Sequence, residues 1–228
     1  MQEYIYKTEL HAHTSPASVC GDFLPGQVLE LYSELGYTSI ALTNHFQFDG
    51  AEDNTPKINA LLKDYEDALR LSEKYNINVI FAAELRFNEG NANDYLVYGI
   101  EPCEMDKIAS MLGGTIEDFY RQYKNDKNII IQAHPFRNKN EPASPEFVDG
   151  IEVFNLHPNH NSRIGIAAKW AKNCGKIITA GTDFHHEGQH ALCAMLTKAP
   201  VTNSFELAEV LKSRDYLLDI SGITVCPY

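Results

Sequence analysis

The sequence lacks the features that mark membrane-spanning, secreted and disulfide-rich proteins. Its 228 residues contain no uninterrupted apolar run that approaches the ~20 residues of a membrane span. The N-terminal residues 1–4 form neither a basic segment nor an apolar one, so no secretory signal is visible. The five cysteines are dispersed and show no C-x-x-C spacing. We therefore predict a cytoplasmic protein with reduced thiols rather than a disulfide framework.

Positive charge is also scarce. The chain has 19 Lys and Arg residues against 31 Asp and Glu residues, which gives a formal net charge of −12. Nucleic acids and anionic membranes are bound by basic surfaces, so neither is expected as a partner. A small anionic substrate is not excluded, because bound divalent cations are able to reverse the sign of a local site. Part of the acidity is then expected to belong to metal ligands.

No internal repeat, low-complexity tract or Pro/Ser-rich linker divides the chain, so residues 1–228 are expected to form a single α/β domain. Short apolar strands alternate with helices, which is typical of parallel βαβ units. The predicted strands are 4–9, 39–43, 78–83, 95–100, 129–132, 150–154, 176–180, 193–197 and 216–220. The predicted helices are 25–35, 57–75, 104–112, 116–124, 163–174 and 204–213. About seven repeats suit a small barrel better than a complete eight-fold one, which needs ~250 residues.

In such a barrel the site lies at the C-terminal ends of the strands. His11 and His13 end the first strand and point to one face, with Cα atoms roughly 6.5 Å apart, so that both can bind one ion. A lone strand-end histidine is more often a satisfied polar residue than a ligand, but later strand ends supply further candidates. These stand in Thr43-Asn44-His45, Ala83-Glu84, Asn93-Asp94-Tyr95, Gln132-Ala133-His134-Pro135 and Gly181-Thr182-Asp183-Phe184-His185. Imidazole and carboxylate without a thiolate set suit zinc, manganese or iron, and the residues suffice for two or three ions.

Together, in this order, the segments H-A-H-T, T-N-H, the strand-end glutamate, A-H-P and G-T-D-F-H resemble the PHP family, named for polymerase and histidinol phosphatase domains. The resemblance covers almost the whole chain. It implies a distorted seven-stranded (β/α) barrel and a metal site, usually of three ions, that hydrolyses phosphoesters. It also implies three ligand sets: His11, His13, Glu84 and Asp183 on one ion, Glu84 and His134 on a second, and His45 and His185 on a third.

Two positions depart from the family pattern. Where members often carry S-D-G or a histidine, this loop reads Ser15-Pro16-Ala17-Ser18-Val19-Cys20-Gly21-Asp22. Asp22 is the expected substitute ligand, Cys20 is the alternative, and Asp22 capping the next helix is the non-functional interpretation. Asp94 stands where many members have a histidine, and it either binds metal through oxygen or only turns the chain. Glu9, before H-x-H, is expected to orient a histidine.

The resemblance favours a metal-dependent phosphoesterase, most simply a phosphatase of a small phosphorylated metabolite. Divalent ions would bind the phosphate oxygens and lower the pKa of a water to form the attacking hydroxide. His185 is the candidate that protonates the leaving oxygen. Arg137 and Arg163 lie on loops at the site face, where a guanidinium suits phosphate binding and exposed salt bridging is the alternative. His157, His160, His186 and His190 are expected at the rim.

Three other functions are consistent with parts of the pattern. An amidohydrolase-type enzyme also opens with H-x-H and ends with a strand-end aspartate, but its chain is normally longer and has a modified lysine where this chain has Glu84. A catalytically weak regulatory or structural metal-binding module would explain the departures at Asp22 and Asp94. A DNA-directed nuclease is disfavoured by the acidic balance.

Overall fold

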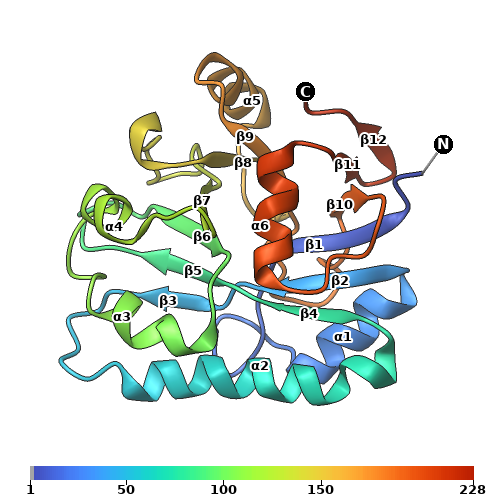
Figure 1. Ribbon diagram of the computed structural model, residues 1–228, viewed down its shortest axis with the longest axis horizontal. Coiled ribbons are helices and arrows are strands. Elements are labelled where there is room, and N and C mark those ends of the chain that lie inside the picture. The colour runs from blue at the N-terminus through green and yellow to red at the C-terminus, as the bar shows by residue number, and fades with distance from the viewer. Residues whose placement is uncertain (1–2) are drawn as a thin grey trace.

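The computed structural model describes residues 3–228, which form two six-stranded sheets with helices around them (Figure 1). The strands are β1 (Tyr6–Ala12), β2 (Tyr37–Leu42), β3 (His45–Gln47), β4 (Asn78–Phe81), β5 (Ala83–Arg86), β6 (Asp94–Tyr98), β7 (Ile129–Ala133), β8 (Gly150–Asn155), β9 (Ile177–Gly181), β10 (Cys193–Thr197), β11 (Leu217–Ile220) and β12 (Ile223–Val225). The helices are α1 (Pro25–Glu34), α2 (Thr55–Tyr75), α3 (Met105–Ala109), α4 (Ile116–Tyr123), α5 (Ile164–Asn173) and α6 (Ser204–Ser213). The predicted α/β class is therefore confirmed.

The strand order is β12-β11-β10-β1-β2-β4 in the first sheet and β3-β5-β6-β7-β8-β9 in the second. The sheets meet where β2 runs into β3 and β4 into β5. They also meet where Ala12, at the end of β1, forms an isolated parallel bridge with Phe184, just after β9. All these junctions lie near strand ends, so the ends of strands from both sheets converge on one region.

The expectation of parallel pairing throughout is wrong at two places. β6 pairs antiparallel with both β5 and β7, and β10, β11 and β12 form an antiparallel tail beside β1. The loop 87–93 between β5 and β6 contains no helix. Because a parallel crossover needs a dozen or more residues, this short loop returns the chain antiparallel.

The helices bury one apolar face each. In α2 the residues Ile58, Leu61 and Ala68 are buried at helical spacing, and they pack where α2 lies along α1 and β4. Leu69, in the same helix, lies on its outer face and is 41% exposed. None of the helices within residues 3–228 is long and apolar enough to cross a bilayer.

Candidate metal centre

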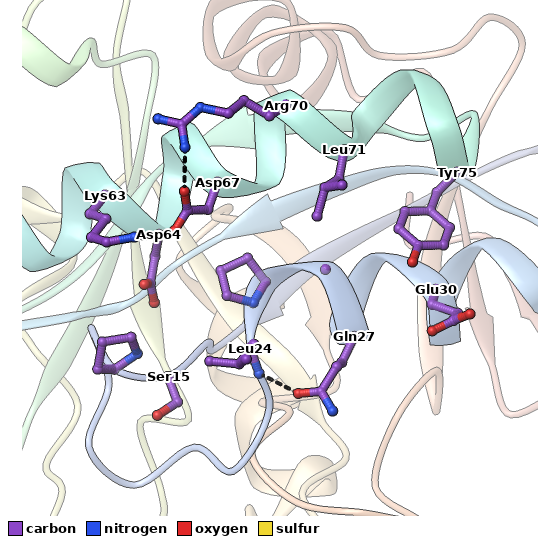
Figure 2. Close-up of a pocket in the computed structure, with 13 residues that line it drawn as sticks. Ser15, Leu24, Gln27, Glu30, Lys63, Asp64, Asp67, Arg70, Leu71 and Tyr75 are labelled. Carbon is purple, nitrogen blue, oxygen red and sulfur yellow. Dashed lines mark hydrogen bonds and ion pairs between the residues drawn. The ribbon is translucent and has the colours of Figure 1, made fainter.

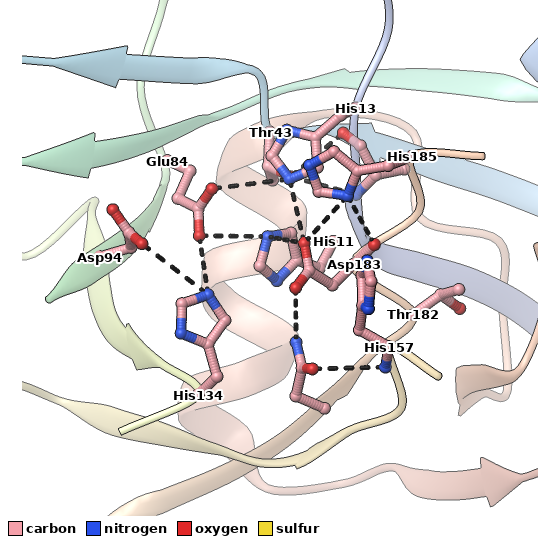
Figure 3. A network of polar contacts seen from close by, with 12 residues as sticks. His11, His13, Thr43, Glu84, Asp94, His134, His157, Thr182, Asp183 and His185 are labelled. Atoms are coloured by element: carbon pink, nitrogen blue, oxygen red, sulfur yellow. Dashed lines mark hydrogen bonds and ion pairs between the residues drawn. The ribbon is translucent and has the colours of Figure 1, made fainter. Parts of the chain in front are cut away.

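Seven imidazole and carboxylate side chains converge where the two sheets meet (Figure 3). They come from the end of β1, from the starts of β3 and β5, and from the segments that follow β7 and β9. All except His45, which is partly exposed, are buried. The seven are His11, His13, His45, Glu84, His134, Asp183 and His185.

The seven residues form three overlapping groups, and within each group the candidate ligand atoms lie within 4.8 Å of one another. The groups share residues, since His11 and His13 each belong to two of them. Their members are His11, His13 and Asp183; His11, Glu84 and His134; and His13, His45 and His185.

Two nitrogens at the centre are buried and have no hydrogen-bond partner: Nε2 of His11 and Nε2 of His13. Nε2 of His11 lies 3.3 Å from Oε1 of Glu84 and 3.4 Å from Oδ1 of Asp183. Oε2 of Glu84 lies 3.5 Å from Nε2 of His13 and 2.6 Å from Nδ1 of His45. A buried polar atom left unsatisfied costs about 1–3 kcal/mol, so imidazole nitrogens that face carboxylates in this way need an explanation. Divalent ions would satisfy these nitrogens, and the residues therefore fit a metal centre.

The outer nitrogens of three imidazoles, those of His11, His13 and His185, face acceptors. Nδ1 of His11 donates to Oε1 of Glu152 at 2.7 Å, and Nδ1 of His185 donates to the Asp183 carbonyl oxygen at 2.9 Å. Nδ1 of His13 lies 3.2 Å from Oγ of Ser18, which can accept its proton. A proton on Nδ1 leaves the lone pair on Nε2, which is the arrangement that an imidazole needs to bind a metal.

Glu152, in the middle of β8, is a site residue that the sequence reasoning missed. Besides His11, it accepts hydrogen bonds from the backbone N–H of His134 and from Nδ2 of Asn155, both at 3.0 Å. A methyl group added at Gly181 would lie 2.1 Å from Oε1 of Glu152 and 2.5 Å from Cβ of His11, so only glycine fits there. The available signal was a carboxylate inside the otherwise apolar strand Gly150–Asn155.

Glu9 does not orient an imidazole ring, contrary to expectation. Its buried carboxylate accepts hydrogen bonds from the backbone N–H groups of His11 and Thr182, at 2.9 and 3.1 Å, and from the hydroxyl of Tyr32 at 3.1 Å. Burial raises the pKa of Glu9 to about 7 in spite of these bonds. Glu9 therefore fixes the backbone that carries His11 rather than the ring itself.

The carboxylates of the cluster raise the pKa values of two of its imidazoles. Burial lowers the pKa of His11, but the charges of Glu152, Asp183 and Glu84 outweigh it and hold that pKa well above its ordinary value. Burial also opposes ionisation of His45, whose pKa is nevertheless raised to about 10, chiefly by Glu84. Binding of a metal ion therefore displaces protons from these imidazoles.

Asp94 lies beside the second group but is held by an arginine. Nε and Nη2 of Arg86 donate to its two carboxylate oxygens at 2.7 and 2.6 Å. Oδ2 of Asp94 is 3.9 Å from Nε2 of His134, which is too far for a hydrogen bond. As a metal ligand, Asp94 would have to share its oxygens with Arg86.

The structure separates the two candidates in the loop after β1. Asp22 is exposed and pairs with Nδ1 of His186 at 2.8 Å, and it belongs to none of the three groups. It does not cap α1, whose N-cap residue is Leu24. Cys20 is also exposed and belongs to none of the three groups, but it lines the same cavity as His45 and His185. Burial opposes ionisation of its thiol, but hydrogen bonds from His185 and His45 prevail and lower its pKa to about 6.

The two arginines have different positions. Nη2 of Arg137 donates to Oδ2 of Asp183 and, at 2.9 Å, to Oδ1 of Asn155, while its Nε is buried without a partner. Arg163 is exposed and donates to the Phe136 carbonyl oxygen and to Oδ1 of Asn138. Arg163 is not among the residues that line the site cavity, so it holds the loop after β7.

Four of the seven residues, His45, His134, Asp183 and His185, line a cavity of about 1020 Å³. Val19, Phe48 and Pro56 form part of its wall, and Phe48 is 39% exposed. Three rim histidines expected from the sequence also line it: His157, His160 and His186.

A second cavity, of about 640 Å³, lies between α1 and α2 (Figure 2). Its charged side chains are engaged with one another, since Asp67 pairs with both Lys63 and Arg70. The carboxylate of Asp64 accepts hydrogen bonds from Oγ1 of Thr14 and from the backbone N–H of Ala17. Asp64 therefore holds the loop after β1 against α2, and the paired side chains of this cavity do not form a second candidate ligand site.

Comparison with known proteins identifies the fold. No family model and no curated protein matches this sequence. A two-domain protein from Bacteroides vulgatus that contains a predicted PHP-like metal-dependent phosphoesterase matches 94% of this chain with a TM-score of 0.63 and 15% identity. This chain covers 64% of that protein, which is less than two thirds of its length.

Two further structures cover nearly the whole of both chains. One, from Bifidobacterium adolescentis and proposed to be a metal-dependent phosphoesterase, has a TM-score of 0.57 at 15% identity, with 90% of this chain and 95% of that chain covered. The other, an amidohydrolase from Chromobacterium violaceum with bound sulfate and no metal, has a TM-score of 0.54 at 14% identity, with 97% and 98% covered. The chain therefore shares its fold with these solved structures.

Proposed function

We propose that this protein is a metal-dependent phosphoesterase that hydrolyses a small phosphorylated metabolite on a distorted seven-stranded barrel of the PHP type. The observation that carries the proposal is the convergence of imidazole and carboxylate side chains in three overlapping groups, in which Nε2 of His11 and Nε2 of His13 are buried without a hydrogen-bond partner. The solved structures of similar fold, two of which are described as phosphoesterases, favour the same chemistry.

The chain offers ligands for up to three divalent ions, either zinc, manganese or iron. His11, His13 and Asp183 would hold the first ion, and Glu84 with His134 would hold the second. His45 and His185 would hold the third. When bound, these ions polarise a phosphoryl oxygen and acidify water. Oε1 of Glu84 lies 3.3 Å from Nε2 of His11 and 3.2 Å from Nε2 of His134, so this carboxylate would be the ligand shared between two ions.

Other residues position the ligands and the substrate. Arg137 holds Asp183 by a charge-assisted hydrogen bond and leaves Nε free, so it both fixes a ligand and adds positive charge at the cavity. His185 cannot protonate the leaving oxygen through Nε2 if that atom binds a metal. We assign the contact with the leaving oxygen to His157 instead. Its Nδ1 accepts a hydrogen bond from the Asn159 N–H, which leaves the ring proton on Nε2. A neutral imidazole at the cavity wall can donate a hydrogen bond to the substrate.

An activity screen on metal-reconstituted protein tests the proposal. The protein is loaded with zinc, manganese or iron and is offered aryl phosphates, a panel of phosphorylated metabolites and aryl amides. We expect phosphoester turnover that a chelator removes and that Glu84→Gln abolishes. The matched control is Glu66→Gln, an exposed glutamate on α2. Amide turnover alone would indicate the amidohydrolase-type alternative, and tight metal binding with no turnover would indicate a regulatory or structural module.

A further inference from the structure

We propose that Asn44 is a positioning residue that, through the hydroxyl group of Ser18, keeps the ring proton of His13 on Nδ1. The inference rests on the proposed metal centre, in which Nε2 of His13 is the ligand atom. All three side chains are buried. Within the segment Thr43-Asn44-His45, which contains the candidate ligand His45, Asn44 therefore has a task of its own.

The orientation of the Asn44 amide is fixed by Thr14. The backbone N–H of Thr14, which can only donate, faces Oδ1 of Asn44 at 2.7 Å. Nδ2 of Asn44 donates to Oγ1 of Thr14, also at 2.7 Å. That hydroxyl group gives its own proton to Oδ2 of Asp64 at 2.8 Å, and the same oxygen accepts the Ala17 N–H at 3.1 Å. The oxygen and nitrogen of the amide therefore cannot exchange places without setting one donor against another.

Ser18 transmits this orientation to His13. Oγ of Ser18 lies 2.9 Å from Oδ1 of Asn44, and because an amide oxygen only accepts, the hydroxyl proton points to Asn44. The lone pairs of Oγ then face the His45 N–H at 3.0 Å and Nδ1 of His13 at 3.2 Å. Since its one proton is given to Asn44, Ser18 can only accept from His13. The ring proton of a neutral His13 is therefore held on Nδ1.

This arrangement matters because two carboxylates compete for the ring proton. Nε2 of His13 lies 3.4 Å from Oδ1 of Asp183 and 3.5 Å from Oε2 of Glu84, and both negative charges attract a proton to that nitrogen. Nε2 nevertheless forms no hydrogen bond within residues 3–228. A proton there would occupy the lone pair that a metal ion needs. Asn44 and Ser18 oppose it by providing an acceptor at Nδ1 alone.

Nitrogen-15 NMR of the metal-free protein tests the tautomer without reference to activity. Spectra that correlate the carbon-bound ring protons with the ring nitrogens show which nitrogen of a neutral imidazole bears the proton. A pH of about 8 is suitable, because an ordinary imidazole has a pKa of about 6.5. The His13 signals are those missing from His13→Gln. We expect the Nδ1–H tautomer in the wild-type protein and in Asn44→Asp, whose carboxylate still accepts from Ser18. Asn44→Leu should populate the Nε2–H tautomer, because the Ser18 proton can then turn to Nδ1.

Metal affinity, measured by competition with a chromophoric chelator, gives a second readout. Loss of an outer partner of a metal-binding histidine typically weakens binding about 10- to 100-fold. We expect a loss in this range for Ser18→Ala, together with a shift of the proton to Nε2, since no acceptor remains at Nδ1. Ser18→Thr keeps the hydroxyl group and should restore both. The matched control is Ser110→Ala, at an exposed serine that donates to the Lys107 carbonyl oxygen.

The alternatives give distinct results. An Nε2–H tautomer of His13 in the wild-type protein would overturn the inference, and so would an unchanged tautomer in both Asn44→Leu and Ser18→Ala. Weaker metal binding in Asn44→Leu with the tautomer unchanged would limit Asn44 to support of the loop. If Asn44→Leu does not fold, Ser18→Ala and the wild-type spectrum decide the question. Failure of the wild-type protein to bind zinc, manganese or iron would overturn the proposed function, whereas the tautomer of the metal-free protein would still decide the inference.

Discussion

Replacing Glu152 with glutamine removes the charge that orients His11. Glu152 is 1% exposed and satisfies three donors with two oxygens: Nδ1 of His11 at one, and the His134 N–H and Asn155 Nδ2 at the other. A glutamine amide has one acceptor oxygen and one NH₂ group. Whichever way the amide is turned, its NH₂ group faces a donor, so at least one buried donor loses its partner.

The size of the effect follows from these contacts. A buried donor without a partner costs about 1–3 kcal/mol, which should appear as a lower free energy of unfolding of the metal-free protein. Loss of an outer partner of a metal-binding histidine typically weakens metal binding about 10- to 100-fold. That range corresponds to about 1.4–2.7 kcal/mol. The pKa of His11 should also fall, because Glu152 is the largest of the charges that raise it against the effect of burial.

Three measurements on Glu152→Gln check this reasoning. Competition with a chromophoric chelator gives the metal affinity, and urea unfolding of the metal-free protein gives the stability. Calorimetry in buffers of different ionisation enthalpy gives the protons released on metal binding, which should decrease. Glu146→Gln, at an exposed position before β8, is the matched control. Wild-type affinity, stability and proton release in Glu152→Gln would refute the assigned role of this carboxylate.

Four further predictions follow from the same geometry. Glu84→Gln should remove at least one equivalent of metal and abolish turnover while the fold is kept; wild-type turnover would exclude a bridging carboxylate. Asp94→Ala should leave Arg86 without its carboxylate and lower the free energy of unfolding by about 1–3 kcal/mol with unchanged metal stoichiometry; loss of about one equivalent of metal would instead make Asp94 a ligand. Gly181→Ala should weaken metal binding, because the added methyl group would lie only 2.1 Å from Oε1 of Glu152. Unchanged binding would show that the end of β9 can shift to make room for the methyl group. Burial lowers the pKa of His157 to about 4, below the value near 6.5 of an unfolded chain, so the unfolded state binds the proton first as the pH falls. Stability is therefore lost from about pH 6.5 down to pH 4, and His157→Gln should lose about 1–3 kcal/mol less over that range in chemical unfolding curves; parallel curves would contradict the shift.

The order of strands and helices could be predicted from the sequence because it depends on local periodicity. Each predicted helix overlaps an observed one, and the strand-end residues were identified because polar groups interrupt apolar runs. The direction of β6 was not predicted, because it depends on how the loop 87–93 returns the chain. The three-residue strands β3 and β12 are too short to give a periodic signal.

The partners of the site residues depend on contacts between distant segments, which explains what the sequence reasoning missed. Glu152 lies 141 positions from His11, and only the pairing of β8 with β9 brings it to the end of β1. The preference for Asp22 rested on a family pattern, but the exposed Asp22 side chain pairs with His186, which lies 164 positions further along the chain. Arg163 has the residue type of a phosphate ligand, but it is exposed and contacts the loop after β7.

The central claim is that the convergent imidazoles and carboxylates hold metal ions that hydrolyse phosphoesters. The most direct test measures metal content by elemental analysis and aryl phosphate turnover on the same sample, before and after chelation and reconstitution with zinc, manganese or iron. We predict two or three equivalents of metal and turnover that disappears and returns together with the metal. Less than one equivalent after reconstitution, or phosphatase activity that is independent of metal content, would contradict the claim.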